Sequence, residues 1–190
     1  MTGKTHDLAA FSALNLAYIW HQPTTISLST FLAVLCANFI GGLTPDIDQP
    51  AGNLWQRLPA GSLFGKLFAP FLGGHRHISH SILGLFLFGY GSRWLLERAS
   101  HTILVDMNLV WWSFMIGLTS HLFMDLFTKE GVPLLFPLSF KFGIPPLSML
   151  RVTTGKLVEK FLVLPALLLF DANLYYHHYR LFLSLFHSVF

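Results

Sequence analysis

Long apolar runs separated by short polar segments form the main pattern along this chain. Residues 24–43 contain no charged side chain over 20 positions, and residues 78–97 and 103–127 are also mainly apolar. A helix needs about 20 predominantly apolar residues to cross the hydrocarbon core of a bilayer. The pattern therefore predicts membrane-spanning helices over these three ranges.

Two further helices are expected, one near each end of the chain. The first covers residues 8–20 with Thr5 as its N-cap, and its apolar core spans only about 20 Å at ~1.5 Å per residue. The last begins near Gly155 and continues, bent at Pro165, toward His178 or beyond. The predicted fold class is all-α: a polytopic helical membrane bundle of about four to five transmembrane or membrane-embedded helices. We expect residues 1–190 to form a single integral membrane domain.

Small residues recur every four positions within residues 24–43. Ala33, Ala37 and Gly41 fall on one face of the expected helix. Such a face lets a neighbouring helix approach closely inside a membrane. We therefore expect this helix to pack tightly against another part of the bundle.

Two proline-containing segments separate the expected helices. Residues 44–77 are expected to form a long loop, with a short interfacial helix near residues 54–58. Residues 131–146 are rich in proline and still apolar. This composition is more typical of a re-entrant or interfacial stretch than of a solvated loop.

The composition supports a membrane protein and excludes several other classes. Hydrophobic residues make up 53% of the chain and charged residues 11%, against about 25% charged residues in soluble domains. The single cysteine, Cys36, excludes an intramolecular disulfide and a CxxC motif. A net charge of +3 without a basic stripe argues against nucleic-acid binding. The absence of a GxSxG motif or a P-loop argues against a serine hydrolase or a nucleotide-driven enzyme.

The unusual polar residues fall on one side of the membrane if each helix crosses it once. That side also receives most of the basic residues, because only Arg93, Arg98 and Arg180 fall on the other side. By the positive-inside rule, the polar side is expected to be cytoplasmic. Its nine basic residues are Lys4, Arg57, Lys66, Arg76, Lys129, Lys141, Arg151, Lys156 and Lys160.

The polar residues on this side are histidines and aspartates in short motifs. His121 and Asp125 are four residues apart on one expected helix, so both project from the same face. Asp46 and Asp48 follow a proline at a helix end. Imidazole and carboxylate without thiolate suit zinc, manganese or iron in a catalytic site. The candidates exceed the three protein ligands of a mononuclear catalytic zinc site, which favours either two metals or one metal with additional acid and base residues.

Each motif also has a plainer interpretation. A single helical histidine such as His6 can be an interhelical hydrogen-bond partner, and the HxxxD pair can be structural. The PDID turn can be a proline-turn cap. Residues 74–81 can be a basic interfacial anchor in which Ser79 or Ser81 caps the next helix. Convergence of all these groups on one membrane face favours a metal site, since ionisable groups at membrane depth are costly and tend to be functional.

The motifs in order resemble a known family. Thr5 and His6, GGLTPDIDQP at 41–50, GHRHISHSILG at 74–84 and SHLFMDLFTKEGVPLLFPL at 120–138 resemble the YdjM-like family of predicted membrane-bound metal-dependent hydrolases. The resemblance implies a helical protein of the bacterial inner membrane with histidine and aspartate metal ligands. A small residue, often glycine, occupies the family position of His77, so His77 is not expected to be a ligand. The positions matched to the family are His6, Asp46, Asp48, His75, Arg76, His80, His121 and Asp125.

A more distant similarity involves zinc-dependent phospholipase C. The order of the histidines and aspartates, ending in HxxxD on a helix, is similar in the two cases.

These observations predict a membrane-embedded metal-dependent hydrolase that acts on an ester or phosphoester of a lipid or lipid-linked substrate. The expected cofactor is a divalent metal, foremost zinc, as one or two ions, with manganese or iron as alternatives. The catalytic candidates are His75, as a ligand, a group that orients a ligand or a general acid, and Arg76, as a phosphate clamp. The alternative is a non-enzymatic membrane scaffold or a metal transporter. The expected metal ligands are His6, Asp46, Asp48, His80, His121 and Asp125.

Overall fold

The computed structural model describes residues 1–23, 26–49, 53–56, 61, 63, 65, 78–138 and 140–189. The regular secondary structure of these residues is helical, and β-structure among them is limited to two isolated bridges. The expected all-α bundle is therefore confirmed. Its long helices are α1 (Gly3–Trp20), α2 (Leu28–Leu43), α5 (Ile82–Ala99), α6 (Met107–Leu126) and α7 (Leu164–Val189).

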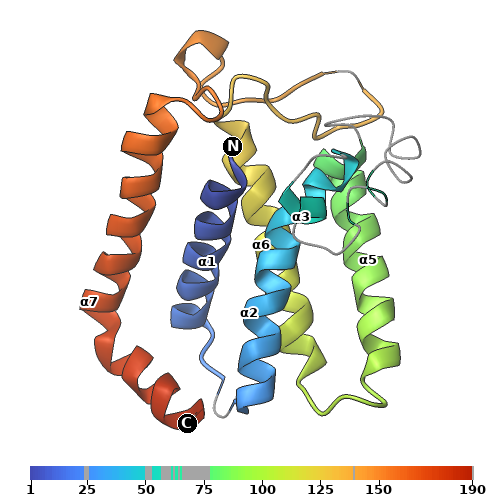
Figure 1. Cartoon of the computed structure of the whole chain (residues 1–190), viewed down its shortest axis with the longest axis vertical. Helices are drawn as coiled ribbons and strands as arrows, with labels where there is room; N and C mark the ends of the chain where they lie inside the picture. Colours follow the sequence, from blue (N-terminus) through green and yellow to red (C-terminus); the bar gives the residue numbers. More distant parts are fainter. Residues whose placement is uncertain are drawn as a thin grey trace.

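Helices α1, α2 and α6 pack against one another and form the centre of the bundle. Helix α5 packs on α6, and α7 packs on α1, so the two outer helices lie on opposite sides (Figure 1). The chain reverses direction from one long helix to the next. Consequently the starts of α1, α5 and α7 and the ends of α2 and α6 lie at the same end of the bundle.

Two of the described helical stretches are long and apolar enough to cross a membrane. They are residues Leu28–Asp48, which include α2, and Met107–Leu126, which form α6. About 20 residues are required for such a crossing. Both stretches lie in the centre of the bundle rather than at its edge.

Side-chain caps determine where several helices begin. Ser27 accepts a hydrogen bond from the Thr30 amide, so α2 begins at Leu28 and not at residue 24 as predicted. Ser81 caps α5 in the same way, as one of the two predicted caps. Asp106 accepts hydrogen bonds from two amides at the start of α6, so this helix begins after the predicted residue 103.

Helix α1 begins before the residue predicted to be its cap. It starts at Gly3, and Thr5 lies inside its first turn with a buried side chain. The prediction was wrong because the Thr5 hydroxyl donates to Glu159 instead of capping the helix. With 18 residues α1 is about 27 Å long at ~1.5 Å per residue, close to the ~30 Å hydrocarbon thickness.

Glycines allow α2 and α6 to approach very closely. A methyl group placed on Gly41 would collide with the Phe114 carbonyl, and one on Gly117 would collide with the Asn38 carbonyl. The Ser113 hydroxyl donates to the Val34 carbonyl across the same interface. Close packing at Gly41 was predicted from its spacing with the alanines, whereas the part played by Gly117 was not predicted.

The segment that joins α6 to α7 covers one end of the bundle (Figure 1). Isolated bridges pair Val132 with Phe142 and Thr128 with Val152. The Arg151 guanidinium also donates to two proline carbonyls within the segment. The described residues of 131–146 are non-helical, as expected, while their re-entrant or interfacial placement remains a prediction.

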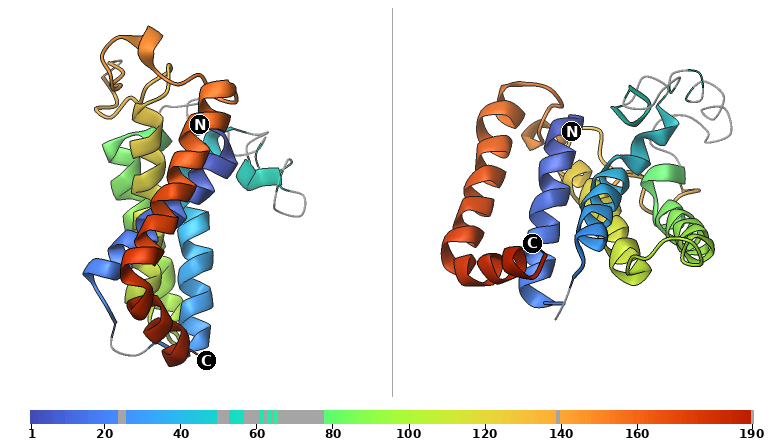
Figure 2. Two further views of the ribbon diagram at one scale, coloured as in Figure 1. Left: turned by 90° about the vertical axis from the view of Figure 1, so that its left-hand side faces the viewer. Right: turned by 60° about the horizontal axis from the view of Figure 1, so that its bottom comes forward.

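The predicted bend of the last helix lies at a different residue. A π-helical turn, η5 (Glu159–Val163), precedes α7, and Pro165 is the second residue of α7. The Leu164 amide donates to the Glu159 carbonyl five residues before it, so the helix is locally wider just before Pro165. The bend lies instead at His178, whose φ of −119° and ψ of 25° are not helical, and the last part of α7 turns toward α1 (Figure 2).

Part of the predicted loop over residues 44–77 is helical. A 3₁₀-helix, η1 (Thr44–Asp48), follows α2 directly. The short helix predicted near residues 54–58 corresponds to α3 (Asn53–Gln56), and Leu58 lies outside the described residues. The Trp55 indole donates to the Ile47 carbonyl over 2.9 Å, which connects α3 to η1.

We predict that Gly117→Ala destabilises the protein by about 1–3 kcal/mol, the usual cost of overpacking. The added methyl group would have to displace the α2 backbone at Asn38. Gly91→Ala on α5 is the matched control, because its Cβ would meet no atom within 4 Å. Thermal unfolding in detergent should show a lower midpoint for Gly117→Ala and an unchanged or higher one for Gly91→Ala. Equal midpoints for the two variants would contradict the tight α2–α6 contact.

Candidate metal centre

Six of the eight predicted site residues lie together at one end of the bundle, and their side chains are buried. The remaining two, His75 and Arg76, lie outside the described residues, as does His77. The six come from separate elements: His6 from α1, Asp46 and Asp48 from η1, His80 from the 3₁₀-helix η3 (Ile78–His80), and His121 and Asp125 from α6.

His121 and Asp125 lie one turn apart on α6 and face the same space. Their Nε2 and Oδ2 atoms are 3.8 Å apart. The other ring nitrogen of His121, Nδ1, lies 2.7 Å from the carbonyl oxygen of Gly42 on α2. Because a carbonyl can only accept a hydrogen bond, His121 Nδ1 is the donor. This bond orients the His121 ring and directs its Nε2 toward Asp125.

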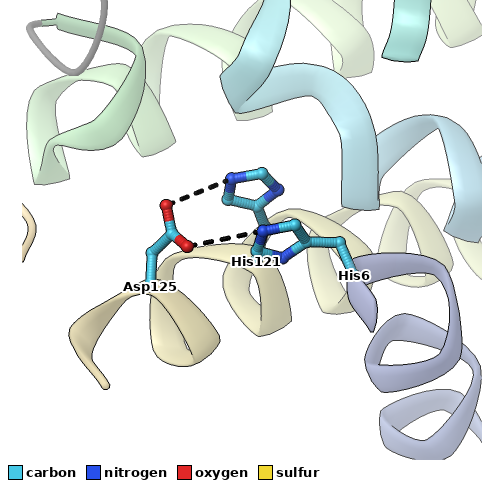
Figure 3. Close-up of side chains that lie close together, drawn as sticks. All are labelled: His6, His121 and Asp125. Atoms are coloured by element: carbon cyan, nitrogen blue, oxygen red, sulfur yellow. Dashed lines mark ion pairs between the residues drawn. The ribbon is translucent and has the colours of Figure 1, made fainter. Parts of the chain in front are cut away.

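His6 enters the site from the first turns of α1. Its ring stacks on that of His121 with centroids 3.6 Å apart and planes 7° from parallel. Its Nε2 lies 3.4 Å from Asp125 Oδ1, and Figure 3 shows the two histidines facing different oxygens of the carboxylate. The amino group of Met1 lies 2.5 Å from the same Oδ1 atom. Asp125 Oδ2 therefore faces the remaining part of the site.

Asp46 and His80 complete the opposite side of the site. His80 Nε2 lies 3.7 Å from both Asp46 Oδ1 and Asp125 Oδ2. His121 Nε2 lies 3.8 Å from the same two oxygens. Two imidazole nitrogens and two carboxylate oxygens thus surround one small space.

Asp48 lies on the far side of the His80 ring. Its Oδ2 is 3.6 Å from His80 Nδ1 and accepts a hydrogen bond of 2.5 Å from the Ser79 hydroxyl. Ser79 Oγ also lies 3.0 Å from His80 Nδ1. A carboxylate beside the non-coordinating nitrogen of a histidine is a usual way of orienting a metal ligand. The ligand role predicted for Asp48 stays a prediction, and the geometry favours orientation of His80.

The chemistry of the donor atoms fits a cation. Since His121 Nδ1 carries the proton, Nε2 of the neutral ring is an acceptor. It faces two carboxylate oxygens and has no hydrogen-bond partner among the described residues. Buried acceptors that face one another are unfavourable. A divalent cation between them would remove this cost.

The distances also fit. Ligand atoms around tetrahedral zinc lie about 3.3 Å apart when the bonds are ~2.0–2.1 Å long. The four distances of 3.7–3.8 Å are only slightly larger. Two groups of three residues have donor atoms close enough to hold an ion: His6, His121 and Asp125, and Asp46, His80 and His121.

A buried glutamate that sequence reasoning missed secures the helix that carries His6. Glu159, at the start of the π-helical turn, accepts hydrogen bonds from the Thr5 and Thr2 hydroxyls and from the Thr2 and Gly155 amides. Burial alone would raise the pKa of Glu159, but these hydrogen bonds outweigh it and hold the pKa below its usual value. Its carboxylate is therefore ionised at neutral pH and ties the starts of α1 and α7 together. A lone glutamate in a mainly apolar stretch was the only sequence signal for this role.

Comparison with known proteins agrees with these motifs. Residues 1–187 match the family model described as YdjM inner membrane protein. The chain belongs to the YdjM inner membrane protein family. This membership confirms the family resemblance predicted from residues 5–138, and the match to the YdjM model covers nearly the whole chain.

Relatives in the YdjM comparison come from several bacteria. The chain is 30% identical over 184 residues to the uncharacterized protein YvsG of Bacillus subtilis, covering 96% of this chain and 97% of YvsG. It is 32% identical over 162 residues to the inner membrane protein YdjM of Escherichia coli, covering 85% of this chain and 77% of that protein. The YdjM protein of Shigella flexneri matches to the same extent. No solved structure matches, and the distant similarity to zinc-dependent phospholipase C stays a prediction.

We predict that Glu159→Ala destabilises the protein by about 1–3 kcal/mol, because it leaves the buried hydroxyl of Thr5 and the half-buried hydroxyl of Thr2 without their acceptor. Glu97→Ala is the matched control, since Glu97 is exposed and pairs with Arg93 on the surface of α5. We expect this control to change stability by less than about 0.5 kcal/mol. Thermal unfolding in detergent measures both, and a Glu159→Ala midpoint equal to that of the control would contradict the proposed tie.

Proposed function

We propose that this YdjM-family protein is a membrane-embedded metal-dependent hydrolase that acts on an ester or phosphoester of a lipid or lipid-linked substrate. The observation that carries the proposal is the buried Nε2 acceptor of His121, which faces Asp46 Oδ1 and Asp125 Oδ2 at 3.8 Å. Such an arrangement is costly without a cation and favourable with one.

The donor set favours zinc, with manganese or iron as alternatives. It consists of imidazole nitrogens and carboxylate oxygens without thiolate, which is typical of catalytic rather than structural zinc sites. Because Nδ1 of His121 is engaged by Gly42, this histidine has one nitrogen available and can serve only one ion. We therefore infer one ion held by Asp46, His80, His121 and Asp125. A second ion would depend on His6 and Asp125 Oδ1.

The chemistry of hydrolysis would follow from such an ion. A bound divalent cation lowers the pKa of a coordinated water and polarises a phosphoryl or carbonyl oxygen. The hydrogen bond from His121 to Gly42 and the pairing of His80 with Asp48 would hold the ligand rings in place. The roles proposed for His75, as general acid or ligand, and Arg76, as phosphate clamp, concern residues outside the described part.

The position of the site suits a lipid substrate. It lies where α1 begins and α6 ends, which is the level expected for lipid headgroups. The covering segment exposes large apolar side chains, among them Leu138, Phe140 and Met149. We propose that this segment contacts the bilayer and that the site faces the cytoplasm of a bacterial inner membrane. The excess of basic residues that the sequence predicts for this side of the membrane supports that orientation.

A metal-dependent scaffold is the second candidate. Its support is that the four inferred ligands come from η1, η3 and α6, so one ion would connect three separate elements. A transporter is less well supported, because its ligands are expected near mid-membrane on broken helices. Here the ligands lie at helix ends.

We predict that the purified protein retains about one divalent ion per chain, as expected for one four-ligand site. The double variant His121→Ala, Asp125→Ala should lose it, because the variant removes the shared ligand and its partner. Elemental analysis after dialysis measures the metal content, and His187→Ala, on the last turns of α7, is the control. Metal-free wild type, or equal metal in the double variant, would refute the site.

Measurement of metal affinity distinguishes ligands from residues that orient a ligand. Asp48→Asn should weaken metal affinity by about 10–100-fold without abolishing binding, the usual effect of removing a partner of a ligating histidine. Competition against a chelator of known affinity measures this change. An affinity loss as large as that of Asp46→Ala would instead identify Asp48 as a direct ligand.

We predict that the metal-loaded protein releases a water-soluble product from a phospholipid or phosphoester in a broad panel of such substrates. A chelator should abolish turnover and added zinc should restore it, because the reaction needs the metal-activated water. His121→Ala should be inactive and His187→Ala fully active. Metal binding without turnover of any panel member would favour the scaffold.

A further inference from the structure

A large cavity lies in the half of the bundle away from the metal centre. Its volume is about 760 Å³, and its walls come from α1, α2, α6 and the last part of α7. The lining residues Phe11 and Ile116 each stand five residues from a histidine of the metal centre, His6 or His121. Five residues turn a helix by about 140°, so the cavity and the metal centre occupy different helix faces. The cavity is a separate site.

The lining of the cavity is mainly apolar. Three of its few polar side chains donate hydrogen bonds to other groups of the protein. The Asn15 amide donates to Asp171, the Tyr18 hydroxyl to the Leu181 carbonyl, and the Ser113 hydroxyl to the Val34 carbonyl. A bound molecule would therefore contact mainly apolar surface and would need no polar groups to pair with these side chains.

The depth of the cavity corresponds to one leaflet. Along α1 the lining extends from Phe11 to His21, a rise of about 15 Å at ~1.5 Å per residue. The hydrocarbon core of a bilayer is about 30 Å thick, so this rise equals one leaflet. His21 ends α1 and is exposed, which places the outer end of the cavity at the membrane boundary.

The bend of α7 at His178 closes one side of this space. Beyond the bend, the Phe182 ring lies 4.4 Å from that of Tyr175 and 5.6 Å from that of Tyr18 on α1. The last turns of α7 thereby pass across the end of α1 (Figure 2). Straight continuation of α7 would leave the cavity open along this side.

We propose that the cavity binds one hydrocarbon chain of a lipid from the leaflet opposite the metal centre. The chain lies along α1 from His21 toward Phe11, and the lipid headgroup stays at the membrane boundary near His21. Apolar cavities of this kind exclude water and accept apolar molecules. The bound chain fills the space between the bent end of α7 and the central helices α2 and α6.

The test uses the full chain in vesicles of phosphatidylethanolamine and phosphatidylglycerol that contain a little phosphatidylcholine with a mid-chain diazirine. After irradiation, we expect labelling to concentrate on Phe11, Leu14 and Ile116 and to saturate as the probe fraction rises. Saturation is expected because the cavity holds one chain. The proposal would be overturned if labelling increased linearly with the probe fraction and if outward residues such as Leu87 and Leu168 were labelled as strongly as the lining residues.

A matched pair of variants provides the control. Ala17→Phe places a ring in the cavity and should reduce labelling of Phe11 and Ile116 several-fold. Ala172→Phe makes the same change at an exposed position of α7 outside the cavity and should leave labelling unchanged. Undiminished labelling of folded Ala17→Phe would also overturn the proposal. If Ala17→Phe does not fold, the saturation curve of the wild type decides.

Discussion

The close contact between α2 and α6 is the constraint on which the rest of the structure depends. Gly41 and Gly117 remove the side chains that would keep the two backbones apart. The contact brings the Gly42 carbonyl within 2.7 Å of His121 Nδ1 and so selects the tautomer that presents Nε2 to the aspartates. In a bilayer, where apolar side chains gain little by leaving lipid, such backbone proximity and polar contact are what hold helices together. The chemistry of the site is thus a consequence of helix packing.

Around this central pair, two polar contacts determine the position of α1. At the site end, Glu159 holds Thr2 and Thr5, next to His6. Farther along, Asp171 accepts hydrogen bonds from Ser12 and Asn15. Helix α1 therefore lies between α6, which shares the site with it, and α7, which supports it from the other side (Figure 1).

Most of the fold could be predicted from the sequence because long apolar runs and short polar interruptions directly indicate helices in a membrane. The errors have specific physical causes. Thr5 looked like a cap, but its hydroxyl is used by Glu159, 154 residues away, and no local pattern reveals such a partner. Pro165 looked like a bend, but a preceding π-helical turn accommodates it in the first turn of α7. The sequence around His178 contains no proline or glycine that would indicate a bend there.

The candidate site was accessible to prediction for a different reason. Short motifs at helix ends, assigned to one side of the membrane, indicated that His6, Asp46, His80, His121 and Asp125 would meet, and the described residues lie together. Asp46 faces the shared space, whereas Asp48 lies behind His80. This difference depends on the fold of η1 and could not be predicted from a spacing of two residues. Ser79 gave no signal of its contact with Asp48, because a serine before a helix suggests a cap.

The polar face of α1 has a consequence for how the chain enters the membrane. Thr5, Ser12 and Asn15 on α1 find their carboxylate partners only on the segment that includes η5 and α7, more than 150 residues later. Unpaired polar groups are poorly tolerated in the hydrocarbon region. The carboxylates of Glu159 and Asp171 therefore become available to α1 only after nearly the whole chain has been synthesised. The helix made first is, in this respect, among the last to complete its polar contacts.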